Sequence, residues 1–225
     1  MTKKIKCMKD LEIFSALDEA EKNDVVRLAR PVLIKKGETV FSEGTSCDKI
    51  YFIRKGSILL YKVSVDGKEM SLDILNQDDI FGEHTIFDEA IHSFNAKALE
   101  DTFVCVCTRD DFMELLKNPK VSIKMMKHLT NKLDGYTDQM ASMAFNDVQG
   151  RIINMIKKLN GKYGMATSKG VKIDVKLSHQ DIANLVNASR VMVSNILGAL
   201  KNEGVITIDE KYIYVVNKTI LEVDM

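Results

Sequence analysis

The hydrophobic pattern of this chain changes twice, from helical spacing to strict alternation and back again. Apolar residues at helical intervals predict a first helical segment from Asp10 to Arg30. From Val32 the period becomes two, and short apolar runs are separated by turn residues such as Lys36-Gly37 and Asp66-Gly67. Short strands with frequent turns are typical of a sandwich or barrel, and a jelly-roll leaves few long edges exposed. We therefore expect a jelly-roll built from Val32–Ile34, Thr39–Phe41, Lys49–Ile53, Ile58–Val65, Met70–Leu75, Asn95–Leu99 and Thr102–Cys107.

Helical spacing returns at Asp110–Lys117, and a long helix is predicted to begin near Pro119. Its apolar residues recur at alternating steps of three and four over nearly three heptads, which is typical of a coiled-coil seam. Part of such a stripe can also cover the helix's own barrel, but the strict two-in-seven spacing favours a dimer. Phe145-Asn146-Asp147 then predicts a hinge, with Asp147 as the N-cap of a helix Val148–Leu159. The predicted dimer interface consists of Met126, Leu129, Leu133, Tyr136, Met140 and Met143.

The stretch Ser178–Leu200 contains two short helical patterns with a tight break at Asn187. Ser178 and Ser189 are predicted N-caps, and asparagine tolerates the left-handed conformation that a sharp turn needs. A helical hairpin that only packs a core would share this pattern. The second helix, however, gathers polar residues near its N-terminal end, and Gly204–Val216 predicts a two-stranded hairpin after it. Together they predict a winged helix-turn-helix whose second helix lies in the DNA major groove. The predicted buried faces are Ile182, Leu185 and Val186 in the first helix, and Val193, Ile196, Leu197 and Leu200 in the second.

Charge is balanced over the whole chain, with 32 basic and 32 acidic residues, but it is unevenly distributed. From Val148 onward there are 11 Lys or Arg and 7 Asp or Glu, an excess that suits contact with phosphates. At 225 residues the chain has room for two modest domains. It contains no glycine-rich phosphate loop, paired-histidine motif or Ser-His-Asp ordering, so an enzyme is not expected.

The N-terminus lacks an apolar run long enough for a signal peptide, and no segment approaches the length of a membrane span. The four cysteines have neither zinc-finger spacing nor the spacing of a disulfide-rich protein. Cys105 and Cys107 are two apart on a predicted strand and are expected to be small apolar fillers of the barrel. We therefore expect a reduced, soluble, cytoplasmic protein with no membrane partner and no protein-held metal.

Several strings, taken in order, resemble the bacterial cyclic-AMP receptor protein and fumarate-nitrate-reductase regulator (Crp/Fnr) family. Ala144–Ile152 resembles its hinge, and the resemblance covers roughly residues 10–216. It implies an α+β fold with a β-roll effector domain at residues 1–118, a dimerisation helix and hinge at 119–146, and a winged helix-turn-helix domain at 147–225. It also implies a homodimeric transcription regulator that binds a palindromic double-stranded DNA operator and recruits or blocks RNA polymerase. The effector-domain landmarks are Gly37, Gly44, Gly56, Gly67, the string Asp79-Ile80-Phe81-Gly82-Glu83 and the string Ala98-Leu99-Glu100-Asp101-Thr102.

The resemblance also locates an effector pocket, and this chain departs from the family there. Members that bind cyclic AMP place a Gly-Glu pair and an Arg-Ser or Arg-Thr pair around the cyclic phosphate and ribose. Gly82 and Glu83 match the first pair, but His92-Ser93 stands where the arginine pair belongs. A largely neutral histidine cannot replace the permanent charge and bidentate fork of arginine at pH 7. We therefore expect an effector other than cyclic AMP, neutral or weakly polar, whose identity is open. The expected pocket is bounded by Gly82, Glu83, His84, Thr85, His92, Ser93, Tyr136 and Thr137.

Two alternatives stay open. His84 follows Phe81-Gly82-Glu83, the position where haem-binding carbon-monoxide sensors of the family place an axial histidine, so a haem-based gas or redox sensor is one of them. His92 and His128 are further candidates for such a ligand, with weaker claims. A surface or pocket histidine without iron is the simpler interpretation of His84. The other alternative is a cyclic-nucleotide-binding-like module that regulates a partner protein.

The predicted DNA contacts lie around the second helix of the helix-turn-helix. Arg190 matches a family arginine that contacts a guanine edge, and this chain has Val191 and Asn195 where the family has a glutamate and a later arginine. Apolar side chains suit thymine methyls and asparagine suits adenine, which predicts an operator richer in A and T than that of the cyclic-AMP regulator. The predicted DNA-binding residues are Arg190, Val191, Met192, Ser194 and Asn195, together with His179, Gln180 and Ser189, which are expected mostly to touch phosphates.

Overall fold

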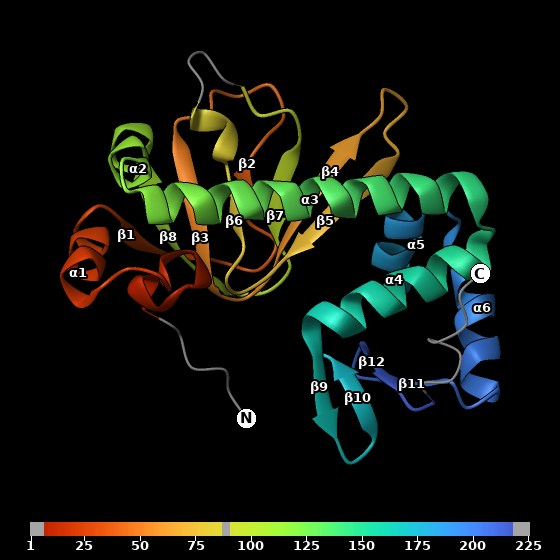
Figure 1. The fold of residues 1–225 in the computed structure, drawn as a ribbon. Helices are drawn as coiled ribbons and strands as arrows, with labels where there is room; N and C mark the ends of the chain where they lie inside the picture. Colours follow the sequence, from red (N-terminus) through yellow and green to blue (C-terminus); the bar gives the residue numbers. More distant parts are fainter. Residues whose placement is uncertain (1–6, 87–90, 218–225) are drawn as a thin grey trace. The chain divides into compact units, whose positions relative to one another are not determined.

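The structure is a computed structural model that describes residues 7–86 and 91–217 (Figure 1). The chain divides into two compact units, Met1–Leu133 and Asp134–Met225. The division falls within one long helix, which begins in the first unit and ends in the second. The finer domain boundaries at 118/119 and 146/147 stay a prediction.

The first unit contains the expected jelly-roll, formed by two four-stranded antiparallel sheets. The strand order is β1-β8-β3-β6 in one sheet and β2-β7-β4-β5 in the other. An apolar layer separates them, with Phe41, Ile58 and Leu60 from the second sheet facing Ile53, Phe81 and others from the first. The strands are β1 (Arg30–Ile34), β2 (Thr39–Phe41), β3 (Lys49–Lys55), β4 (Ile58–Val63), β5 (Glu69–Leu75), β6 (Ile80–Phe81), β7 (Asn95–Ala98) and β8 (Thr102–Thr108).

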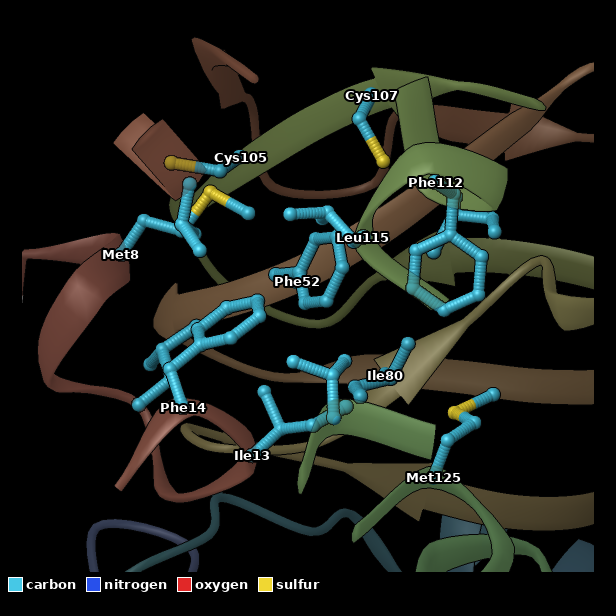
Figure 2. Packing of buried hydrophobic residues seen from close by; sticks show 14 of the residues in the cluster. Met8, Ile13, Phe14, Phe52, Ile80, Cys105, Cys107, Phe112, Leu115 and Met125 are labelled. Carbon is cyan, nitrogen blue, oxygen red and sulfur yellow. The ribbon is translucent and has the colours of Figure 1, made fainter. Parts of the chain in front are cut away.

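The outer face of the β1-β8-β3-β6 sheet is also buried, because helical segments cover it (Figure 2). Ile50 and Phe52 of β3 point to this side, whereas Tyr51 and Ile53 point into the jelly-roll. Phe14 packs against Phe52 with ring centroids 5.7 Å apart. Cys105 and Cys107 are buried, but in this second cluster rather than inside the barrel. Burial raises the pKa of Cys107 to about 12, so its thiol stays protonated.

The prediction of one helical segment from Asp10 to Arg30 was wrong. The structure has two short 3₁₀ turns, η1 (Met8–Asp10) and η2 (Glu12–Phe14), and then a helix α1 (Glu19–Arg27). The irregular part ends at Asp18, which forms a capping box. The Asp18 carboxylate accepts the Glu21 N–H, and the Glu21 carboxylate accepts the Asp18 N–H. The helix therefore begins only after Asp18, although the apolar spacing begins earlier.

Two helices follow the jelly-roll. In α2 (Arg109–Leu116), Thr108 caps the N-terminus and Phe112 and Leu115 join the outer cluster. The long helix α3 (Pro119–Phe145) buries Val121 and Met125 in the same cluster.

The second unit is a helical core with a four-stranded sheet of order β11-β12-β10-β9. Asp147 caps α4 as predicted, and α4 continues to Tyr163, four residues beyond the predicted end at Leu159. The hairpin of β9 and β10 was not predicted. The turn predicted at Asp209-Glu210-Lys211 is confirmed, with positive φ at Glu210 and Lys211. The elements are α4 (Val148–Tyr163), β9 (Gly164–Thr167), β10 (Gly170–Ile173), α5 (His179–Val186), α6 (Arg190–Asn202), β11 (Ile206–Asp209) and β12 (Tyr212–Val215).

Gly56 offers a direct test of the jelly-roll. Its φ is +103°, and a Cβ there would lie 2.6 Å from the Cα of Thr102, whose hydroxyl accepts the Ser57 N–H at 3.1 Å. Gly37 has a φ of +80° with nothing within 4 Å of such a Cβ. We expect Gly37→Ala to lower the free energy of unfolding by about 1–2 kcal/mol, the cost of a left-handed alanine. Gly56→Ala should cost clearly more in urea denaturation, because the backbone of β8 must shift; equal losses would contradict the packing described.

Candidate nucleic-acid interface and effector site

Local signals fix both helices of the helix-turn-helix as predicted. The Ser178 hydroxyl accepts the Asp181 N–H, and the Asp181 carboxylate accepts the Ser178 N–H at 2.7 Å, which closes a capping box at the start of α5. Asn187 ends α5 in the left-handed conformation, with φ 48° and ψ 56°. Ser189 then caps α6 by accepting the Met192 N–H at 3.2 Å. The sharp turn and the start of α6 are thus both specified within three residues.

The buried faces are largely those predicted. Ala183 is fully buried, which allows the two helices to cross closely. Leu185 and Ile196 are only half-buried, so the prediction that they are buried was wrong. The fully buried members are Ile182, Val186, Val193, Leu197 and Leu200.

The N-terminal part of α6 presents most of the predicted base-reading residues to solvent. Val191 and Met192 are 69% and 46% exposed, although both are apolar. Arg190 and Asn195 are exposed as well. An isolated pair of exposed apolar side chains beside an arginine and an asparagine can contact thymine methyls and base edges.

The remaining predicted residues are held by hydrogen bonds within the unit. His179 Nδ1 lies 2.7 Å from the Ser194 hydroxyl, and both residues are half-buried. Gln180 donates to the Asn184 side-chain oxygen at 2.8 Å. The contacts of all eight residues with DNA stay predictions.

In the first unit, the Gly-Glu pair lies on a turn that faces α3. Gly82 has a φ of +85°, and the short turn η3 (Glu83–Ile86) follows it. The Lys132 ammonium donates to the Glu83 carboxylate and, at 3.3 Å, to the Ile80 carbonyl. Burial acts to raise the pKa of Glu83, but the adjacent Lys132 outweighs it and holds that pKa below its usual value. Glu83 is therefore a buried carboxylate that stays charged.

His128 lies one turn before Lys132 on the same side of α3. Burial, and then the charge of Lys132, lower its pKa, so the imidazole is neutral at pH 7. Sequence analysis missed Lys132, whereas it named His128 only as a weaker candidate for a haem ligand. The signal in the sequence was the helical spacing of His128 and Lys132 from Val121 and Met125, in a row next to the seam.

The two predicted pocket histidines lie in the aromatic layer of the jelly-roll. The His92 ring is 3% exposed and stacks on Phe41, with ring centroids 3.5 Å apart and an interplanar angle of 3°. The His84 ring meets Phe94 edge-on at 5.6 Å. Within the part of the chain that the structure describes, neither Nδ1 atom has a hydrogen-bond partner. Burial, and then the neighbouring His84, lower the pKa of His92.

The other predicted pocket residues are distributed differently. Ser93 is exposed. The side chain of Thr85 lies outside the described residues, and Tyr136 and Thr137 belong to the second unit. A pocket that combines all of these residues stays a prediction.

The seam predicted on α3 is largely uncovered in the single chain. Met126, Leu133 and Met140 are 59%, 65% and 72% exposed, and Leu129 is exposed too. Tyr136 and Met143 are half-buried. Large apolar side chains exposed in one row along a helix are typical of a surface that another protein covers.

Residues 7–86 and 91–217 contain neither a cluster of metal ligands nor a membrane-spanning helix. No three His, Cys, Asp or Glu side chains gather as metal ligands there. No helix in those ranges has the length and apolar character that crossing a membrane requires.

Comparisons with known proteins agree with this arrangement. A model of the cyclic nucleotide-binding domain matches residues 31–118, and a model of the Crp-like helix-turn-helix domain matches residues 150–223. The chain is 32% identical to the anaerobic regulatory protein of Bacillus subtilis over 79% of this chain and 75% of that protein. It is 26% identical to the CRP-like cAMP-activated global transcriptional regulator of Mycobacterium tuberculosis over 90% of this chain and 91% of that one. A solved structure of the c-di-GMP responsive global regulator CLP of Xanthomonas campestris shares the fold, with a TM-score of 0.75, 19% identity, and coverage of 89% of this chain and all of that one.

The depressed pKa of His92 predicts how stability depends on pH. Because the folded state binds this proton less tightly than the unfolded state, stability is full above the unfolded pKa of about 6.5 and falls as the pH drops below it. His84 and Asp48 are the titratable groups that act on His92, the first lowering and the second raising its pKa. In urea denaturation between pH 7.5 and about 5, His92→Phe should show a shallower loss of stability than the wild type. Identical pH profiles would contradict the burial of a neutral His92.

Proposed function

The chain belongs to the Crp/Fnr family of transcription regulators and carries its DNA-binding helix-turn-helix domain, and we propose that it acts as a homodimer under the control of an effector other than cyclic AMP. The observation that carries the proposal is α6, whose N-terminal end presents Arg190, Val191 and Asn195 to solvent on a frame fixed by two N-caps. The regulator works in the cytoplasm, where it meets the chromosome. Contact with RNA polymerase at a promoter belongs to the same proposal.

The residues around α6 have different roles in binding DNA. Arg190 pairs bidentately with a guanine, Asn195 reads adenine, and Val191 and Met192 contact thymine methyls. Gln180, His179 and Ser189 fix the register through phosphates. The basic excess after Val148 adds a contribution that does not depend on sequence and weakens with salt.

Dimerisation follows from the exposed apolar row on α3. One copy of α3 covers the row on a second copy, because the heptad steps between Met126 and Met143 bring the same residues together in a parallel pair. Two linked recognition helices then meet two half-sites about one turn of DNA apart, which is the geometry that a palindromic operator needs.

The side chains around the Gly82-Glu83 turn argue against a cyclic phosphate. His92, at the position of the family arginine, is neutral and stacked on Phe41, so it offers neither a permanent charge nor a fork of donors. Glu83 is already paired with Lys132. A neutral or weakly polar effector suits this lining better, provided that it binds more tightly to one arrangement of the dimer than to the other.

Haem fits these residues poorly. A ligating histidine normally donates its second ring N–H to an oxygen, and that contact fixes the ring. His84 Nδ1 is buried and lacks such a partner in the part of the chain that the structure describes. We therefore derive no step through haem. A module that only regulates a partner protein is likewise disfavoured by the complete helix-turn-helix.

A charge placed in the seam tests the proposed dimer. Leu133→Asp places a charge in the apolar seam of both chains, at a cost on the order of several kcal/mol if it stays ionised. Light scattering should show a monomer, and DNA affinity should collapse with it, because two half-sites need two linked readers. Asn131→Asp adds the same charge at an exposed position away from the seam and should leave the dimer intact. A Leu133→Asp protein that remains a dimer would refute the seam.

The second prediction concerns base reading. Arg190→Ala should weaken binding to a selected operator by about 1–3 kcal/mol and relax the preference for guanine at one position of each half-site. Arg27→Ala removes another exposed arginine, from the first unit, and should change neither. A selection that returns the cyclic-AMP regulator's own half-site would contradict the assignment of Val191 and Asn195.

The third prediction concerns the effector. Isothermal titration calorimetry with cyclic AMP should show no binding at micromolar concentrations, because no arginine meets the cyclic phosphate. Clear binding there would overturn the argument from His92. In a haem titration, a Soret band present in the wild type and altered in His84→Ala would contradict our exclusion of haem.

A further inference from the structure

The hydrogen bond between His179 and Ser194 connects the first residue of α5 to the middle of the recognition helix. It is short, at 2.7 Å between Nδ1 and Oγ, and both side chains are half-buried. A serine inside a helix commonly turns its hydroxyl back to the carbonyl one turn earlier. Ser194 instead faces the imidazole of the other helix, so the bond is a specific link between α5 and α6.

The bond leaves two arrangements of protons. In a neutral imidazole one nitrogen donates and the other accepts. Either Ser194 donates its hydroxyl hydrogen to a bare Nδ1 and Nε2 carries the ring proton, or Nδ1–H donates to Oγ and Nε2 is bare. The neighbouring carboxylate does not decide between them, because Asp181 is already engaged by the hydroxyl and N–H of Ser178.

A phosphate next to Nε2 would favour the arrangement in which Nε2 carries the ring proton. A bare nitrogen lone pair repels a phosphate oxygen, whereas Nε2–H donates a charge-assisted hydrogen bond to it. We propose that Ser194 donates to His179 Nδ1 and thereby presents His179 Nε2–H to a phosphate of the operator. This inference rests on the proposed DNA-binding function and adds a task to it: Ser194 is a positioning residue that acts through His179, not a reader of bases.

The assignment also explains the exposure pattern on α6. Val191 and Asn195 are exposed on the solvent face, and Arg190 is exposed at the N-terminal end. Ser194 is half-buried and hydrogen-bonded to His179 of α5. Base discrimination therefore falls to the exposed residues, and the His179–Ser194 pair sets the distance between α6 and the DNA backbone.

A double-mutant cycle on DNA affinity tests the link. Ser194→Ala should weaken binding roughly fivefold to tenfold, and His179→Phe by about tenfold or more, on the scale of a hydrogen bond to a charged group. The double variant should bind no more weakly than His179→Phe alone, because Ser194 acts only through His179. Ser168→Ala, the same substitution at an exposed turn of this unit, should leave affinity unchanged. Losses that simply multiply in the double variant would overturn the proposal.

A spectroscopic readout separates this role from a merely structural one. In the DNA complex, ¹⁵N chemical shifts of the His179 ring should place the proton on Nε2 and leave Nδ1 bare. A complex in which Nδ1 carries a proton would overturn the proposal. If the wild type binds no selected DNA at all, the proposed function fails; if it binds and the cycle shows no coupling, only this inference fails.

Discussion

The structure depends on α3, which packs against the first unit along one face and exposes an apolar row along the next. The inner side of α3 buries Val121 and Met125 and brings Lys132 to the buried carboxylate of Glu83, so it is fixed to the sensor unit by packing and by an ion pair. Removing one partner of such a buried pair is strongly destabilising, because an uncompensated charge is left behind. The neighbouring face of the helix leaves Leu133 and Met140 exposed to solvent. A helix held firmly on one face cannot rotate to bury its second apolar row, so we expect a partner to cover that row.

The DNA-binding unit rests on local constraints rather than on long-range ones. Asn187, in the left-handed conformation, and the two serine caps set the direction of α6 from within the segment itself. The two helices pack against each other, and Ala183 of α5 and Val193 of α6 are fully buried. This division suits a regulator, because a DNA-binding unit specified by local contacts keeps its shape while the proposed dimer sets its placement on DNA.

Features with a local cause could be predicted from the sequence, and features with a distant cause could not. The strands, the caps at Ser178 and Ser189 and the exposed apolar row on α3 all have a signature in neighbouring residues. The hairpin of β9 and β10 leaves none, because all four residues of β9 are exposed and show no apolar alternation. The roles of Lys132 and of the His92 ring depend on Glu83 and Phe41, which lie far away along the chain. The helix predicted over Asp10–Arg30 failed for another reason: the capping box at Asp18 overrode the apolar spacing.

We propose that two copies of this chain, paired through α3, bind one palindromic operator with two recognition helices. Hydroxyl-radical footprinting of the purified protein on an operator found by selection tests it most directly. We expect two protected patches related by two-fold symmetry, with their centres one helical turn (about 34 Å) apart along the DNA. Protection of one half-site alone, at protein concentrations that saturate the DNA, would contradict it.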